Sequence, residues 1–182
     1  MIHRIYLLIV CTLLFSGCAS VFNFGHSRPD IVLRPDFNGD GIAVLTFSAQ
    51  GSYLRSDAGI IAADRFSEEM FLQRRFNVID RARVNRIALD LEIKSGENLS
   101  NEQIREVGRR LDANYIAVGK LFQETEPFQF IDDIDKTLTV SIRLMDTETA
   151  EMVGVARYTV SYKDEYHNTI KMMMNRIARR MR

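Results

Sequence analysis

An apolar run near the amino terminus constrains this chain most, because it decides which part of the sequence can fold as a domain. Residues 5–15 carry no charge, follow Arg4, and lead into Ser16-Gly17-Cys18. A membrane-spanning helix needs about 20 apolar residues, so this run is too short to stay in a bilayer as one. A basic start, an apolar middle and a small-residue end predict a cleaved secretory signal over residues 1–17. The rest of the 182-residue chain has the length of one domain.

Cys18 is the only cysteine that would remain after cleavage, because Cys11 leaves with the signal. Small residues directly before a cysteine are what bacterial lipoprotein processing requires, so we predict that Cys18 is acylated and holds the protein on membrane lipid. The alternative is a plain secretory signal with an incidental cysteine. Ala19 stands where inner-membrane lipoproteins favour Asp, which predicts the outer membrane, facing the periplasm. A single cysteine excludes an internal disulfide and a cysteine-based metal site.

The remaining charge is balanced, which argues against a nucleic-acid partner. Without Arg4, the 24 basic residues of the chain become 23, against 24 acidic ones. Residues 18–40 hold two of the three prolines together with two glycines, and we predict a tether that starts at the lipidated Cys18 and packs in part on its own domain or on a neighbour. Residues 41–182 form the predicted folded domain.

The apolar periodicity of that domain predicts a single α/β domain, a mixed five-stranded sheet with helices packed on it, in the order β-α-β-α-α-β-β-β-α. Strands are expected at residues 42–47, 76–79, 115–122, 138–144 and 152–162. Helices are expected at residues 56–73, 80–91, 100–111 and from 164 onward. The first helix has a predicted inner stripe of Ile60, Ala63, Phe66 and Met70. Ser100 and Gln103 form a predicted capping box at the start of the third helix.

Few residues suggest chemistry. No glycine-rich phosphate loop, zinc-protease motif or nucleophile elbow is present in the sequence. His26 falls in the tether and His167 at the start of the last helix, and we interpret both as surface residues. Asp132, Asp133 and Asp135 could bind a hard cation, but they lack the glycine and the distal glutamate of a calcium loop. We therefore predict no catalytic, cofactor or metal site and no enzyme.

The last helix carries Lys171, Arg176, Arg179, Arg180 and Arg182, and no acidic residue follows Glu165. One interpretation is a helix docked on the core, whose cations suit the negative end of its dipole. The other is a basic helix that lies on anionic lipid. The pattern favours the docked helix.

Four motifs follow one another along the domain. They are the apolar strand 42–47; residues 75–81, which end in Asp80-Arg81; residues 104–119, with Leu111, Ala113, Asn114, Tyr115, Ile116 and Gly119; and Arg143-Leu144-Met145-Asp146 followed by Thr149-Ala150-Glu151. Their order resembles the CsgG-like family of curli assembly and transport lipoproteins. Two positions depart from the family pattern, because Thr46 stands where Asp is frequent and Ala150 replaces a glycine that eases a positive φ angle.

The resemblance implies the periplasmic domain of that family without its pore. A membrane strand needs about 9–11 residues, and neither residues 123–136 nor residues 147–150 leave room for a transmembrane hairpin. The first hypothesis is therefore an outer-membrane-anchored periplasmic lipoprotein that acts in envelope or appendage assembly or secretion as a CsgG-like accessory or scaffold, as a homo-oligomer or with an unidentified envelope protein. The second is a tethered lipoprotein regulator of a cell-wall synthase or a flagellar structure, as other small lipoproteins of this broad fold are.

Overall fold

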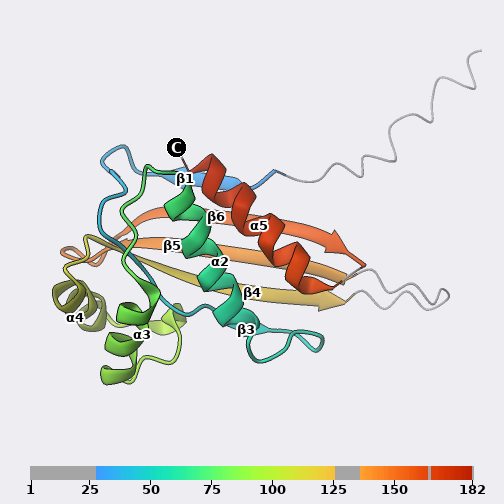
Figure 1. Ribbon diagram of the computed structural model, residues 1–182, viewed down its shortest axis with the longest axis horizontal. Helices are drawn as coiled ribbons and strands as arrows, with labels where there is room; N and C mark the ends of the chain where they lie inside the picture. The colour runs from blue at the N-terminus through green and yellow to red at the C-terminus, as the bar shows by residue number, and fades with distance from the viewer. Residues whose placement is uncertain (1–27, 126–135, 164, 182) are drawn as a thin grey trace, which may run out of the picture.

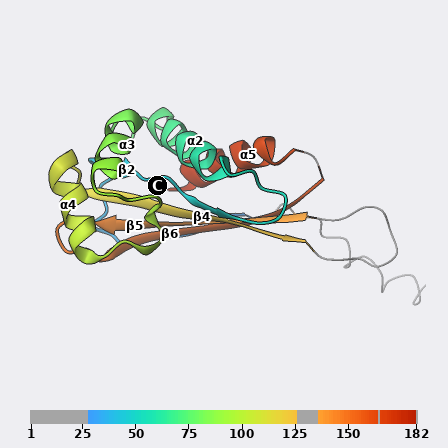
Figure 2. The same cartoon turned by 90° about the horizontal axis from the view of Figure 1, so that it is seen from below.

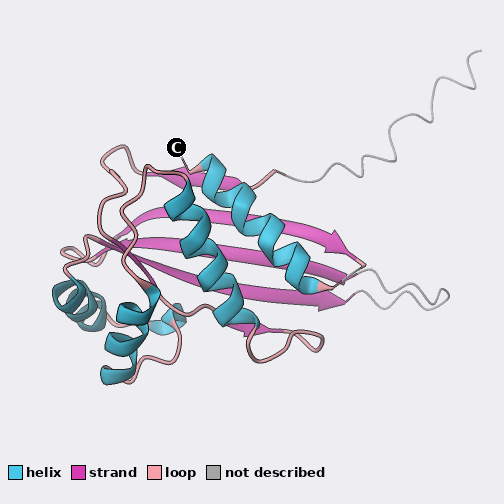
Figure 3. Ribbon diagram, in the orientation of Figure 1, coloured by secondary structure: helices cyan, strands magenta, loops and turns pink. Residues whose placement is uncertain are grey.

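Three strands of 11 residues form the centre of the sheet in this computed structural model, which describes residues 28–125, 136–163 and 165–181. β4 (Tyr115–Thr125), β5 (Lys136–Asp146) and β6 (Met152–Tyr162) pair antiparallel. β1 (Asp30–Leu33) pairs antiparallel with β6, whereas β2 (Ile42–Val44) and β3 (Ser48–Gln50) pair parallel with β4. The order is β1-β6-β5-β4-β2, and β3 lies beside β4 further along (Figure 3).

Two long helices cover one face of this sheet. α2 (Ala58–Leu72) and α5 (Tyr166–Arg180) lie side by side across the central strands (Figures 1 and 2). They run in the same direction, since Tyr166 contacts Asp57 near their beginnings and Asn175 contacts Glu69 further along. α3 (Arg81–Asp90), α4 (Asn101–Leu111) and the short 3-10 helix η1 (Gly96–Asn98) gather at one end of the sheet.

Two hydrophobic clusters lie on opposite sides of β2. The larger one fills the space between the sheet, α2 and α5, and the smaller one joins β2 and β4 to α3 and α4. Ile42, Ala43 and Val44 are all completely buried because side chains on both faces of this strand meet a cluster. A strand covered on both faces needs a continuous apolar sequence, and this explains the run that begins at Ile42.

The α/β class, the mixed sheet and the single domain are confirmed, although the sheet has six strands in place of five. The helices begin and end within a few residues of their expected positions. Asp80 caps α3 by accepting hydrogen bonds from the backbone N–H groups of residues 82 and 83, and the capping box of Ser100 and Gln103 is formed. No helix in the described ranges has both the length and the apolar character that crossing a bilayer requires.

Two predicted strands differ. The expected strand 42–47 ends at Val44 as β2, and a separate strand, β3, begins at Ser48. Between them the ring of Phe47 packs onto Gly119, where a Cβ atom would come within 2.6 Å of it. The expected strand 76–79 is a single bridge between Val78 and Ile42, since the α3 cap at Asp80 ends the extended segment almost at once.

The predicted tether contributes to the sheet. Its residues Asp30–Leu33 form β1, the edge strand beside β6. The predicted boundaries at residues 17 and 40 stay predictions, and the first of them lies outside the described residues.

Candidate interaction site

Of the residues considered for chemistry from the sequence, His167 is the one that the structure describes. Cys18, His26, Asp132, Asp133 and Asp135 lie outside the described residues. His167 is in the first turn of α5, and its ring stacks on that of Tyr166 with 4.1 Å between the centroids. Both line an open recess of about 830 Å³ at the end of the sheet where α2 and α5 begin.

The recess is built around tyrosine contacts. Gln123 donates a 2.8 Å hydrogen bond to the Tyr162 hydroxyl, and Tyr166 donates to Asp57 Oδ1 at 3.5 Å. Burial raises the pKa of both phenols, so they stay protonated at neutral pH. The described residues contain no group of three or more His, Cys, Asp or Glu side chains that could hold a metal ion. His167 therefore belongs to a packed aromatic corner, and the contacts described give it no orienting carboxylate of the kind a general base uses.

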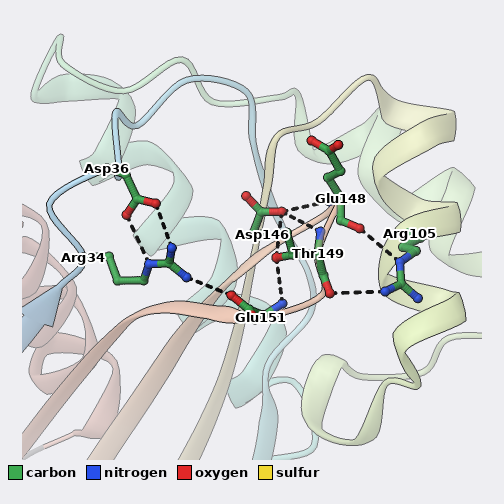
Figure 4. Close-up of polar contacts among 7 residues, drawn as sticks. All are labelled: Arg34, Asp36, Arg105, Asp146, Glu148, Thr149 and Glu151. Atoms are coloured by element: carbon green, nitrogen blue, oxygen red, sulfur yellow. Dashed lines mark hydrogen bonds and ion pairs between the residues drawn. The ribbon is translucent and has the colours of Figure 1, made fainter.

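The turn between β5 and β6 contains the last of the four sequence motifs and is stabilised by hydrogen bonds among its own residues (Figure 4). Asp146 Oδ1 accepts hydrogen bonds from the backbone N–H groups of Glu148 and Thr149, at 2.9 and 2.8 Å. Ala150 has a φ angle of 61°, in the left-handed region that its glycine counterpart would adopt without strain. The Asp-x-x-Thr pattern is therefore explained by turn geometry.

Two arginines hold this turn from its sides (Figure 4). Arg105 of α4 donates to the carbonyl oxygens of Glu148 and Thr149, at 3.0 and 3.2 Å. Arg34 bridges Glu151 and Asp36 with two 2.9 Å ion pairs. The ion-paired side chains are about half exposed, and exposed pairs contribute little to stability. The cluster therefore holds the turn against α4 and against the segment that follows β1.

A groove between α2 and α3 combines apolar and acidic groups. Its volume is about 580 Å³, and its lining includes Asp64, Glu68, Phe71, Asp80 and Arg81. The side chains of Phe71 and the adjacent Leu72 are each 66% exposed, on a helix whose opposite face is fully buried. Large apolar side chains exposed next to a hollow are typical of protein-binding surfaces.

Arg81 fixes the floor of this groove. Its side chain is 13% exposed, donates from Nε to Asp64 Oδ1 at 2.9 Å, and donates from Nη1 to the carbonyl oxygen of Val44. It thereby ties α3 to β2 and to α2. Glu68 and Asp80 are also in the lining, where Glu68 is ion-paired with Arg65 at 2.6 Å and Asp80 caps α3.

Sequence reasoning missed this groove. It requires α3 to lie next to α2, which periodicity does not indicate. One signal was present, because Phe71 and Leu72 directly follow Met70 and therefore fall outside the inner stripe of their helix.

Neither a protein-family model nor a curated protein matches the sequence. Solved structures do match. A PelC dodecamer from Paraburkholderia phytofirmans is 14% identical with a TM-score of 0.54, over 83% of this chain and 96% of that chain. The LpoB C-terminal domain from Escherichia coli is 12% identical with a TM-score of 0.51, over 70% and 87%. Lipoprotein GNA1162 from Neisseria meningitidis is 12% identical with a TM-score of 0.52, over 79% and 97%. At such low identity these matches show a shared fold.

The resemblance to the CsgG-like family is therefore wrong, because the similar structures are PelC, the LpoB domain and GNA1162. The reason is visible in the motifs themselves. Ile42 and Ile116 are core residues, Gly119 lies under Phe47, and Asp146 forms a turn. Residues that the fold itself requires recur in distant proteins of the same fold and do not identify one branch.

Proposed function

We propose that this chain is a lipid-anchored protein of the bacterial envelope whose folded domain binds a periplasmic protein through the groove between α2 and α3. The observation that carries the proposal is the exposure of Phe71 and Leu72 at the end of α2, next to the groove that Phe71 lines. Keeping two large apolar side chains in water is unfavourable, and a partner that covers them beside a hollow removes that cost.

The anchor at Cys18 and a location on the outer membrane, facing the periplasm, are part of this proposal. Two of the similar structures support it: GNA1162 is a lipoprotein, and the LpoB structure is a C-terminal domain. Such a domain would sit at the end of an amino-terminal tether, as residues 18–29 would provide here before β1 begins at Asp30.

For the partner, we propose a cell-wall synthase, which the domain would regulate without catalysing a reaction itself. Of the two sequence hypotheses, the tethered regulator fits the findings better, because the other one depended on the CsgG-like resemblance. A regulator needs a binding surface on a rigid domain, and the α2–α3 groove offers one whose floor is fixed by Arg81.

The test uses the purified lipoprotein together with the cell-wall synthase of the same bacterium. The protein should increase the rate of glycan polymerisation several-fold, and the double variant Phe71→Ser, Leu72→Ser should lose that effect. Met152→Ser is the matched control, because Met152 is also half exposed but lies on β6. A double variant that stimulates like the unaltered protein would exclude the groove, and an unaltered protein without effect or binding would exclude the synthase. The mass of the amino-terminal peptide tests the anchor separately.

A second candidate is an oligomeric envelope scaffold. It is favoured by the dodecameric state of the PelC structure and by β1, which pairs on one side with β6 and has no second strand neighbour among the described residues. An open strand edge can pair with another copy of the chain. Native mass spectrometry of the intact protein in detergent, over a range of concentrations, should then give a defined ring-sized oligomer, whereas a monomer at every concentration would exclude the scaffold.

A further inference from the structure

The last helix is docked on the core through one side only. The inner side of α5 is docked on the core, where Ile170, Met173, Met174 and Ile177 are completely buried. Its outward side is basic, because Lys171, Arg179 and Arg180 are exposed. A docked helix therefore still exposes three cations to the surroundings.

The helix itself contains no acidic residue. No Asp or Glu follows Glu165 in the sequence, and Glu69 of the adjacent α2 is buried in a hydrogen bond from Asn175. Asp30 of β1 is an exposed acid, and it directly follows Pro29, which accepts a hydrogen bond from Arg180 of this helix. The helix dipole explains cations in the last turn, at Arg179 and Arg180, but it does not explain Lys171 in the middle of the helix.

The end of this helix lies where the tether enters the domain. Arg180 donates a 2.8 Å hydrogen bond from Nη1 to the carbonyl oxygen of Pro29, directly before β1, and Arg28 beside it is exposed. The ten residue steps from Cys18 to Arg28 reach at most about 35 Å when fully extended. An acylated Cys18 would therefore keep this end of α5 close to the membrane surface.

We propose that the outward face of α5, formed by Lys171, Arg179 and Arg180 together with Arg28, binds the anionic phospholipid headgroups of the membrane that carries the anchor. Basic residues next to a membrane are attracted by anionic lipid over about one Debye length. Which membrane the helix contacts rests on the proposed anchor at Cys18, whereas the affinity of the helix for anionic lipid does not depend on that anchor. In Figure 1, α3 and α5 flank α2 on opposite sides, so contact through α5 leaves the α2–α3 groove free for a protein.

The experiment measures binding of an unacylated chain of residues 19–182, which retains every residue of the described fold, to sedimented vesicles. The vesicles contain phosphatidylethanolamine alone or with about a third phosphatidylglycerol. We expect binding to the anionic vesicles only, weakened by salt. The double variant Lys171→Gln, Arg179→Gln should bind about 30-fold more weakly, from two lost charges. It keeps the hydrogen bond from Arg180 to Pro29.

The matched control is Arg86→Gln, Lys94→Gln, which removes the same charge from exposed positions on α3 and just after it. It should bind like the unaltered chain, and a variant with lysine at residue 179 should keep the affinity. An equal loss in the control, equal binding to neutral vesicles, or no binding to anionic vesicles would each overturn the proposal. Circular dichroism verifies that each variant is folded. Absence of acylation at Cys18 would contradict the proposed anchor and leave this vesicle result unchanged.

Discussion

The helices α2 and α5 have the same length, run side by side in the same direction and bury their inner faces against the same sheet, yet their outer faces are opposite in character. α2 exposes Phe71 and Leu72 and borders an acidic groove. α5 exposes Lys171 and Arg179 and carries no acid. The packing of the core requires only the inner faces, so the outer faces were free to diverge.

This difference teaches that docking on the core and binding elsewhere are separate properties of one helix. The inner faces should control stability, whereas the outer faces should control partners. Substitutions on the two sides of each helix test that separation, and the largest losses of stability are expected for the inner faces.

The first prediction compares two phenylalanines on α2. Phe66 is completely buried and Phe71 is 66% exposed. Phe66→Ala should lower the free energy of unfolding by about 3–5 kcal/mol, because it leaves a cavity between helix and sheet. Phe71→Ala should change it by less than about 0.5 kcal/mol. Urea unfolding followed by circular dichroism measures both. A comparable loss in both variants would mean that the outer face of α2 also supports the fold.

The second prediction concerns the close approach of α2 to the sheet. A Cβ atom at Gly59 would lie 2.0 Å from the carbonyl oxygen of Phe47. Gly59→Ala should therefore destabilise the protein by about 1–3 kcal/mol, although alanine is the better helix former by about 1 kcal/mol. The opposing atom belongs to the backbone, so no side-chain rotation relieves the contact. A melting temperature equal to or above that of the unaltered protein would show that α2 has room to move.

Local signals predicted the elements well. The capping box at Ser100 and the cap at Asp80 involve residues within three positions of each other, so the sequence contains all of their information. Contacts distant in sequence were not predictable in the same way. β1 pairs with β6, whose residues are more than 120 positions away, and Phe47, between β2 and β3, packs onto Gly119.

The outer face of α2 shows the same limit. Helical periodicity placed Ile60 on the inner stripe with Ala63, Phe66 and Met70, but Ile60 is 48% exposed, so this part of the prediction was wrong. Which stripe is covered depends on α5 and the sheet, and small residues such as Ala58 and Ala62 occupy the close contact instead. The groove depends in the same way on α3. The basic character of α5, by contrast, could be predicted from its amino-acid sequence.

The third prediction concerns the polar contact that joins the two helices. Asn175 of α5 donates a 2.6 Å hydrogen bond to Glu69 of α2, whose side chain is buried. Asn175→Ala should cost about 1–3 kcal/mol, because it leaves a buried carboxylate without this donor. Asn168→Ala, at an exposed position of the same helix, is the control and should be nearly neutral. Equal stability of both variants would show that this hydrogen bond does not help to hold the two helices together.

The smallest effect on stability is expected for α4. Its outer face contains both acidic and basic residues that form ion pairs with one another, whereas α5 contains no acidic residue. Hydrogen bonds from Arg109 and then Arg110 lower the pKa of Glu106 from 4.5 to about 2. A carboxyl group with a depressed pKa in the folded state stabilises the protein above its unfolded pKa, and this contribution is lost as the pH falls from about 4.5 towards 2.

The unaltered protein should therefore be slightly more stable than Glu106→Gln at pH 6, and the difference should narrow at pH 3 and in high salt, because the pairs are exposed. Urea unfolding at each pH measures it. Glu148→Gln is the control, since that carboxylate points away from the groups drawn in Figure 4. A difference that persists unchanged at pH 3 would mean that Glu106 acts through packing and not through its charge.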